Sequence, residues 1–128
     1  MVVPFDVTIV GTLLMVERSL AAAETLATEG ISAEVIDLRW IRPIDLPTIE
    51  ASVRKTGRLV IAEEQWHEGG WGATIISELV QRGMTFKAPP VAVSLPHDLL
   101  IPYSPTLEDE MLPSAERIAA GARTAAGR

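Results

Sequence analysis

The stretch VIDLRWIRPID (residues 35–45), followed by GRLVIAEE (residues 57–64), contains two apolar segments that each end in polar residues. The first segment breaks into a basic turn closed by Pro43, and Asp45 is a residue type favoured at the N-cap of a helix. The second segment ends in the paired carboxylates Glu63 and Glu64. A strand, a short helix and a second strand in this order predict a right-handed crossover between parallel strands.

The same alternation runs along the rest of the chain. Apolar, β-branched runs predict strands at 6–10, 32–38, 58–62 and 91–95, and helical periodicity predicts helices from Leu13, from Asp45, after the 65–72 loop and from Ser114. We therefore expect one domain, residues 1–128, with an α/β fold: a three-layer α/β/α arrangement around a mostly parallel sheet. The first helix is expected to turn an apolar face inward, and so is the third; those faces comprise Val16, Leu20, Ala23 and Ala27, and Ile75, Ile76, Leu79 and Val80. The proline-rich 89–105 region is expected to form loops. The alanine-rich C-terminal helix is expected to be the least firmly held element, with a frayed end at 123–128.

Composition excludes several classes of function. The net charge of −6 among 128 residues disfavours nucleic acid and favours a basic partner. The chain has no cysteine, which removes disulfides and thiolate metal sites. The N-terminus shows no basic region or cleavage site and no apolar run approaches a membrane span, so no membrane role and a cytoplasmic location are expected.

Gly11, Thr12, Glu63 and Glu64 follow two strands that are expected to be neighbours. In an open α/β sheet, ligands bind beyond the carboxyl ends of the strands at the topological switch point. These residues therefore predict a small polar crevice, in which one carboxylate would raise the pKa of the other. The alternative is that one Glu faces solvent while the other caps a helix or pairs with Arg39 or Arg42.

Two histidines and two arginines are candidates for catalysis, metal binding or anion binding, but the sequence favours none of these roles. His67 has no adjacent nucleophile, and the glycines around it suit a tight loop that enters a helix. His97 and Asp98 supply too few ligands for a metal site. Arg39 and Arg42 could clamp an anion, but pairing with Asp37 or Asp45 is the favoured interpretation.

The strings quoted above, together with PHDLLIPYSPTLE (residues 96–108), resemble the C-terminal domain of the E1 beta subunit of thiamine-diphosphate-dependent 2-oxo acid dehydrogenases of the pyruvate, acetoin and branched-chain type. This domain is a relative of the transketolase C-terminal domain, and the resemblance runs from about Asp6 to the last helix. It implies a five-stranded mixed sheet, with its parallel strands in the order second, first, third, fourth. An antiparallel strand would come first, where only residues 1–4 remain to supply it.

The resemblance also implies a role. The parent enzyme decarboxylates a 2-oxo acid oxidatively and passes the acyl group to lipoyl-E2, using thiamine diphosphate and Mg²⁺ held by domains outside this chain. No Gly-Asp-Gly occurs here, so we expect no catalytic, cofactor-binding or metal-binding residue, and Glu63 and Glu64 should not activate the cofactor. The chain alone is expected to be inactive and to serve assembly with four partners: a second copy of itself, the E1 alpha subunit, the thiamine-binding part of E1 beta, and the peripheral subunit-binding domain of E2.

The expected interface is the proline-stiffened run of Leu99, Leu100, Ile101, Pro102 and Tyr103, unless the run folds back onto its own sheet. Two other functions stay open. One is the C-terminal domain of a transketolase or a 1-deoxyxylulose-5-phosphate synthase, against which Asp37-Leu38-Arg39 and the Pro102-Tyr103 pair argue. The other is a stand-alone module that binds a small anion near Gly11-Thr12 and residues 69–72.

Overall fold

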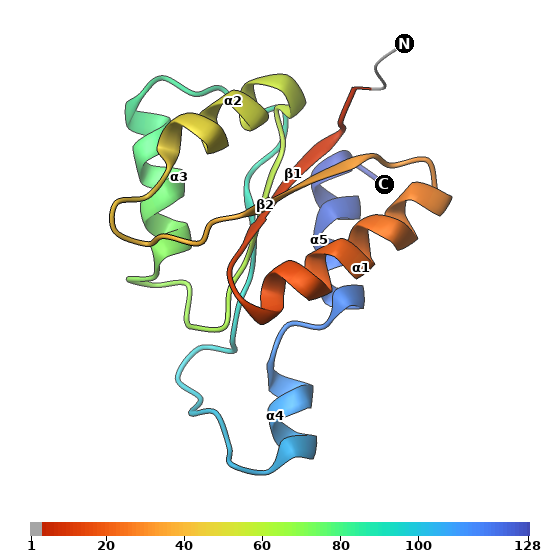
Figure 1. The fold of residues 1–128 in the computed structure, drawn as a ribbon, viewed down its shortest axis with the longest axis vertical. Helices are drawn as coiled ribbons and strands as arrows, with labels where there is room; N and C mark the ends of the chain where they lie inside the picture. The colour runs from red at the N-terminus through yellow and green to blue at the C-terminus, as the bar shows by residue number, and fades with distance from the viewer. Residues whose placement is uncertain (1–3) are drawn as a thin grey trace.

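The computed structural model describes residues 4–128 and contains a four-stranded parallel sheet between two layers of helices (Figure 1). The strands are β1 (Val7–Gly11), β2 (Ala33–Asp37), β3 (Leu59–Ala62) and β4 (Val91–Val93). The helices are α1 (Leu14–Thr28), α2 (Leu46–Thr56), α3 (Trp71–Gln81), α4 (Pro105–Met111) and α5 (Ala115–Ala126). The three-layer α/β prediction is confirmed.

The strand order is β2-β1-β3-β4, as the resemblance implied. Chain order reverses between β1 and β3, where Gly11 is the register partner of Ala62. The loops that follow these two strands therefore leave the sheet side by side, at its carboxyl edge. The predicted antiparallel strand falls on residues 1–4, of which 1–3 lie outside the described residues.

Each face of the sheet has its own core. On one face, α1 and α5 pack on the strands around Ile9, Leu26, Val60 and Ile118. On the other face, α2 and α3 pack around Ile49, Val53, Ile61, Ile75 and Leu79. β1 and β3 are buried along their whole length, whereas β2 is only partly buried because it lies at one edge of the sheet.

Local signals placed the ends of α2 correctly. The Asp45 side chain accepts a hydrogen bond from the backbone N–H of Thr48, and its interaction with Thr48 holds the pKa of the carboxyl below its ordinary value. Gly57 ends the helix with φ 69°, a left-handed conformation that glycine adopts without strain. The predicted pair of Glu50 and Arg54 forms, with 2.6 Å between Oε1 and Nη2.

The inward faces of two helices differ from prediction. In α1 the buried residues are Met15, Ser19, Ala22 and Leu26, one position before the predicted stripe, and Leu20 is 53% exposed. In α3, Ile75 and Leu79 are buried as expected, but Val80 is 56% exposed. Both errors concern apolar residues next to a buried position, so hydropathy alone did not separate the two sides of the helix.

The C-terminal helix is more deeply embedded than its composition suggested. Ile118, Ala119, Ala122 and Ala125 of α5 are buried against α1 and the sheet. Close packing also explains Gly121, where an added Cβ would lie 2.9 Å from Val93 Cγ2. Small side chains let the helix approach the strands, so the alanine content indicates tight packing here.

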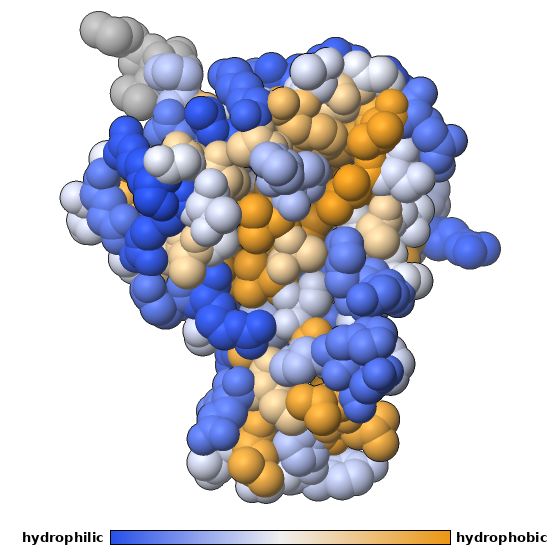
Figure 2. Space-filling view, turned by 180° about the vertical axis from the view of Figure 1, so that it is seen from behind, coloured by the Kyte–Doolittle hydropathy of each residue, from blue (hydrophilic) through white to orange (hydrophobic). Residues whose placement is uncertain are grey.

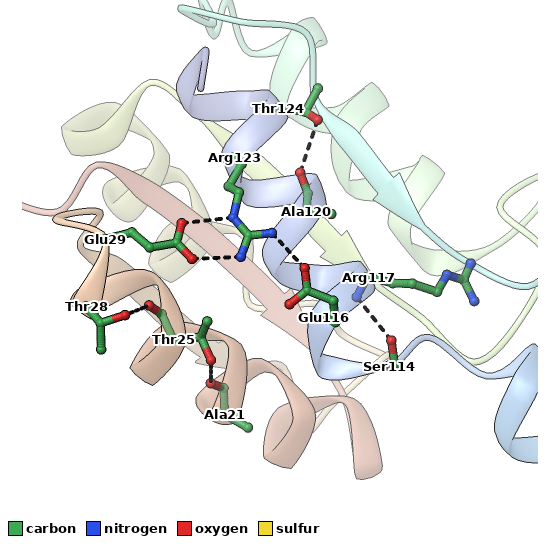
Figure 3. Close-up of polar contacts among 10 residues, drawn as sticks. All are labelled: Ala21, Thr25, Thr28, Glu29, Ser114, Glu116, Arg117, Ala120, Arg123 and Thr124. Carbon is green, nitrogen blue, oxygen red and sulfur yellow. Dashed lines mark hydrogen bonds and ion pairs between the residues drawn. The ribbon is translucent and has the colours of Figure 1, made fainter.

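An ion-pair network joins the ends of α1 and α5 (Figure 3). Arg123 contacts Glu29 through Nη2 and Oε1 at 2.7 Å, and contacts Glu116 through Nη1 and Oε1 at 2.8 Å. The hydrogen bonds from Arg123 lower the pKa of Glu29. α5 stays helical through Ala126, which contradicts the frayed end that we expected from position 123 onward.

Candidate functional site

Glu63 lies at the end of β3 and is fully buried. Its Oε1 contacts His67 Nδ1 at 2.7 Å and accepts a hydrogen bond from Ser94 Oγ at 2.8 Å. Its Oε2 accepts hydrogen bonds from Gln65 Nε2 at 3.1 Å and from the backbone N–H of Gly72 at 3.3 Å. Four contacts to donor-capable groups offset the cost of taking a carboxylate out of water.

The glycines of the following loop make room for this carboxylate. A Cβ on Gly72 would lie 2.8 Å from Glu63 Oε2 and 2.5 Å from Ile61 Cγ2. A Cβ on Gly70 would lie 3.1 Å from the same carboxylate oxygen and 2.5 Å from Gln65 Nε2. The two glycines therefore let the first turn of α3 pack directly against Glu63. Glu63 caps this turn, as the alternative to a ligand crevice predicted for one of the two glutamates.

Glu64 has a different environment, although it is the next residue. It is half-buried, and burial raises its pKa above the ordinary value; Glu108 raises it further and Arg18 opposes the rise. The cause is burial and not the neighbouring Glu63, which points into the interior. Neither carboxylate meets Arg39 or Arg42 within residues 4–128.

Gly11 ends β1, and Thr12 starts the loop that follows it. Thr12 lines a groove of about 570 Å³ between α1 and the turn after β2, together with Leu13, Val16, Leu20 and Ile41. Glu63 lies instead beneath the 64–70 loop, where its hydrogen-bond partners come from that loop, α3 and Ser94. A small-ligand crevice that uses all four predicted residues stays a prediction.

The arginine turn forms one of the predicted pairs. Arg39 Nε lies 3.0 Å from Asp37 Oδ2, and both side chains are accessible to solvent. Arg42 has no ion pair within residues 4–128, and Asp45 acts as the α2 cap instead. An exposed pair of this kind contributes about 0.2–1 kcal/mol.

The second histidine, His97, is exposed and contacts two acidic side chains. His97 Nδ1 is 3.2 Å from Glu68 Oε2, and its Nε2 is 3.2 Å from Asp98 Oδ2. The pKa of Glu68 is lowered by a hydrogen bond from the backbone N–H of Glu68 and by one from His97. Among residues 4–128, no three His, Cys, Asp or Glu side chains come together as metal ligands would.

Residues 96–112, which we call the apolar projection, extend from the carboxyl edge of the sheet and include α4 (Figure 1). Sequence reasoning missed α4 because prolines dominate the segment, yet Pro105 occupies the first turn of a helix, where no N–H is required. Leu112 anchors the end of the projection in the core, but the predicted interface residues are exposed: Leu99 by 50%, Leu100 by 85%, Ile101 by 41%, and Tyr103 completely. They do not fold back onto the sheet.

Hydrophobic surface is exposed on this projection, as it is on part of the body above it (Figure 2). Where it joins the body, a groove of about 470 Å³ is lined by Leu95, Leu99, Leu100 and Ile101, and from the preceding loop by Gln65, Trp66, Glu68, Gly69 and Gly70. The indole N–H of Trp66 donates to the carbonyl oxygen of Leu99 at 3.1 Å, which fixes one wall of the groove. The projection itself carries four acidic residues and no Lys or Arg; we call these acids, Asp98, Glu108, Asp109 and Glu110, the acidic rim.

Two arginines tether the projection to the body. Arg18 of α1 donates to the Pro113 carbonyl at 2.8 Å and pairs with Asp109 at 3.1 Å. Arg117 of α5 donates to the carbonyls of Met111 and Ser94 at 3.1 and 3.0 Å. Sequence reasoning did not identify Arg18, Arg117 or Ser94, although Ser94 follows a parallel strand and therefore had to lie at the same edge as Glu63.

No helix in residues 4–128 has the length and apolar character needed to cross a bilayer.

Comparison with known proteins gives consistent matches over nearly the whole chain. Residues 4–118 match the family described as "Transketolase, C-terminal domain". The acetoin:2,6-dichlorophenolindophenol oxidoreductase subunit beta of Cupriavidus necator is 43% identical over 118 residues, which are 92% of this chain and 35% of that protein. The pyruvate dehydrogenase E1 component subunit beta-1, mitochondrial, of Arabidopsis thaliana is 46% identical over 123 residues, which are 96% of this chain and 34% of that protein.

A solved structure agrees with the fold. The protein described as "Split gene transketolase, inactive beta4 tetramer" superposes with a TM-score of 0.84 at 30% identity, covering 98% of this chain and 40% of the other. This chain spans about a third of the length of the curated relatives quoted above.

Proposed function

Because the chain belongs to the transketolase C-terminal domain family and is similar to E1 beta subunits, we propose that it is the assembly and partner-docking domain of the beta subunit of a 2-oxo acid dehydrogenase. The observation that carries the proposal is the apolar projection, which exposes Leu100 and Tyr103 beside a preformed groove. Exposed apolar surface of this kind, on a segment tethered to the body by hydrogen bonds, is typical of an interaction site.

The partners follow from the chemistry of this surface. A second copy of the chain could bury the apolar residues, and the tetramer named for the related split-gene transketolase supports self-association. The acidic rim suits a basic partner, for which the peripheral subunit-binding domain of E2 is our candidate. The E1 alpha subunit and the remainder of E1 beta would complete the enzyme, and acyl transfer to lipoyl-E2 is the reaction that the assembly would support.

The residues present do not fit thiamine diphosphate with Mg²⁺. Within residues 4–128, no three carboxylate or imidazole side chains converge to hold the metal, and the polar atoms of buried Glu63 are all engaged by its own loop, α3 and Ser94. We propose that the cofactor is held elsewhere in the parent enzyme and assign no catalytic step to this chain. The cytoplasmic location stays a prediction, since some relatives are mitochondrial.

The isolated chain is expected to give no saturable heat of binding with thiamine diphosphate and Mg²⁺ in titration calorimetry. The physical reason is that its carboxylates are either committed to internal hydrogen bonds or dispersed over the surface. Micromolar, saturable binding to this chain alone would contradict the purely accessory role.

Binding of the E2 peripheral subunit-binding domain is expected to weaken about 1.4- to fivefold for each rim charge removed, because a solvent-exposed pair contributes about 0.2–1 kcal/mol. Asp98→Asn and Glu110→Gln remove charges that lie on the projection, and Asn suits the left-handed backbone at Asp98, where φ is 61°. Affinity is measured by calorimetry at two salt concentrations, with Glu24→Gln on the exposed side of α1 as the control. Absence of binding at 100 μM (about −5.5 kcal/mol) in low salt would contradict E2 docking.

The alternatives keep specific tests. A transketolase or 1-deoxyxylulose-5-phosphate synthase domain shares this fold, and the kind of thiamine-binding domain encoded together with this sequence would distinguish it. A small-anion module would instead bind inorganic phosphate near Gly11-Thr12 or residues 69–72. The similarity to E1 beta subunits over 92–96% of the chain favours the proposal over both.

A further inference from the structure

The contacts of Glu63 constrain the proton on His67. Oε1 is shared by the Ser94 hydroxyl and His67 Nδ1, and Oε2 is shared by Gln65 and the Gly72 N–H. A carboxylate can only accept hydrogen bonds, so a nitrogen 2.7 Å from Oε1 has to carry the hydrogen. In a neutral imidazole, a proton on Nδ1 leaves the lone pair on Nε2.

We infer that Glu63 is a positioning residue, which holds His67 in the Nδ1–H tautomer and so leaves Nε2 as a solvent-accessible hydrogen-bond acceptor. The ring is about one-third exposed, and Nε2 makes no hydrogen bond with residues 4–128. Trp66 and Glu68, on either side of His67, line the groove beside the projection.

The inference rests on the proposed function only in the choice of the partner group that would donate a hydrogen bond to His67 Nε2. A solvent-accessible acceptor suits an N–H group of a partner, and the charge of the projection favours a basic one. The tautomer itself is a property of the isolated chain, so it can be tested without any partner.

Glu63→Gln is expected to reverse the tautomer while keeping the shape of the site. The Gly72 N–H can only donate, so the carbonyl oxygen of the glutamine takes the Oε2 position and its NH₂ takes the Oε1 position. The NH₂ then donates to His67 Nδ1, which must give up its proton, and the proton moves to Nε2. The Ser94 hydroxyl can rotate to accept.

The measurement is a two-bond ¹H–¹⁵N correlation spectrum of the imidazole at a pH well above the range in which histidine titrates. A His97→Gln background removes the signals of the other of the two histidines in the chain. We expect the Nδ1–H pattern in the chain that keeps Glu63, which we call the parent in this test, and the Nε2–H pattern in Glu63→Gln. Ser94→Ala is the matched control, because it removes a donor to the same oxygen and should keep the Nδ1–H pattern.

The same tautomer in the parent and in Glu63→Gln, or an Nε2–H imidazole in the parent, would overturn the inference. If Glu63→Gln fails to fold, the parent spectrum still decides, because it reports the tautomer directly. Failure of E2 docking would leave this result untouched, so the two proposals fail separately.

Discussion

Ile118→Ala is expected to lower the free energy of unfolding by about 2–5 kcal/mol, the range for deleting a buried aliphatic side chain. Ile118 is completely buried where α5 meets α1 and the sheet. A loss of this size is a large fraction of the stability of a small domain, which is about 5–15 kcal/mol. Urea denaturation measures the loss as a shift of the midpoint.

Leu20→Ala is the matched control for this measurement. Leu20 is 53% exposed on α1, so its truncation should lower the free energy of unfolding by less than about 1 kcal/mol. Surface substitutions typically change it by about 0.5 kcal/mol or less. Equal losses for the two variants would show that α5 is held no more firmly than a surface position. That outcome would restore the weaker C-terminal helix that the alanine-rich sequence suggested.

Leu100→Asp is expected to raise the dissociation constant of a homodimer at least about tenfold, since 1.4 kcal/mol corresponds to that factor. Leu100 is 85% exposed on the projection and would be buried by a second copy. A symmetric interface contains the substitution twice, which doubles the loss of apolar burial and places two carboxylates in the contact. Sedimentation equilibrium at several concentrations gives the constant.

Leu20→Asp places the same charge on a different exposed leucine and should leave the dimer intact. A parent chain that is strictly monomeric at tens of micromolar (about −6 kcal/mol) would remove the homodimer from the proposal. An equal rise of the dissociation constant in both variants would mean that the dimer interface lies elsewhere, or that any added negative charge weakens it. The projection would then be a candidate site for E2 or for the other parts of the enzyme, and not for a second copy of the chain.

Much of the fold was determined locally and could be predicted. Asp45 and Gly57 end α2 because a carboxylate cap and a left-handed glycine act within a few residues. The pair of Asp37 and Arg39 forms for the same reason, since the two residues are two positions apart. Buried strands between helical segments then allow few arrangements other than a parallel sheet with crossovers.

The inward side of α1 could not be predicted in this way. The helix carries two overlapping stripes, one through Leu20 and one through Leu26, and the buried stripe includes the polar Ser19. Hydropathy favoured the stripe without serine, but contact with α5, almost a hundred residues later, selects the other. Long-range packing decides between two faces of similar composition.

The sequence by itself determined that β3 ends in two carboxylates at the carboxyl edge of the sheet. It did not determine which one is buried, because β3 is enclosed on both faces and strand alternation gives no preference. Only the tertiary structure brings Ser94, His67 and the N-terminus of α3 around Glu63 and leaves Glu64 near Arg18 and Glu108. The physical reason is that a carboxylate can be buried only where donors from several segments converge, and their convergence depends on the packed fold.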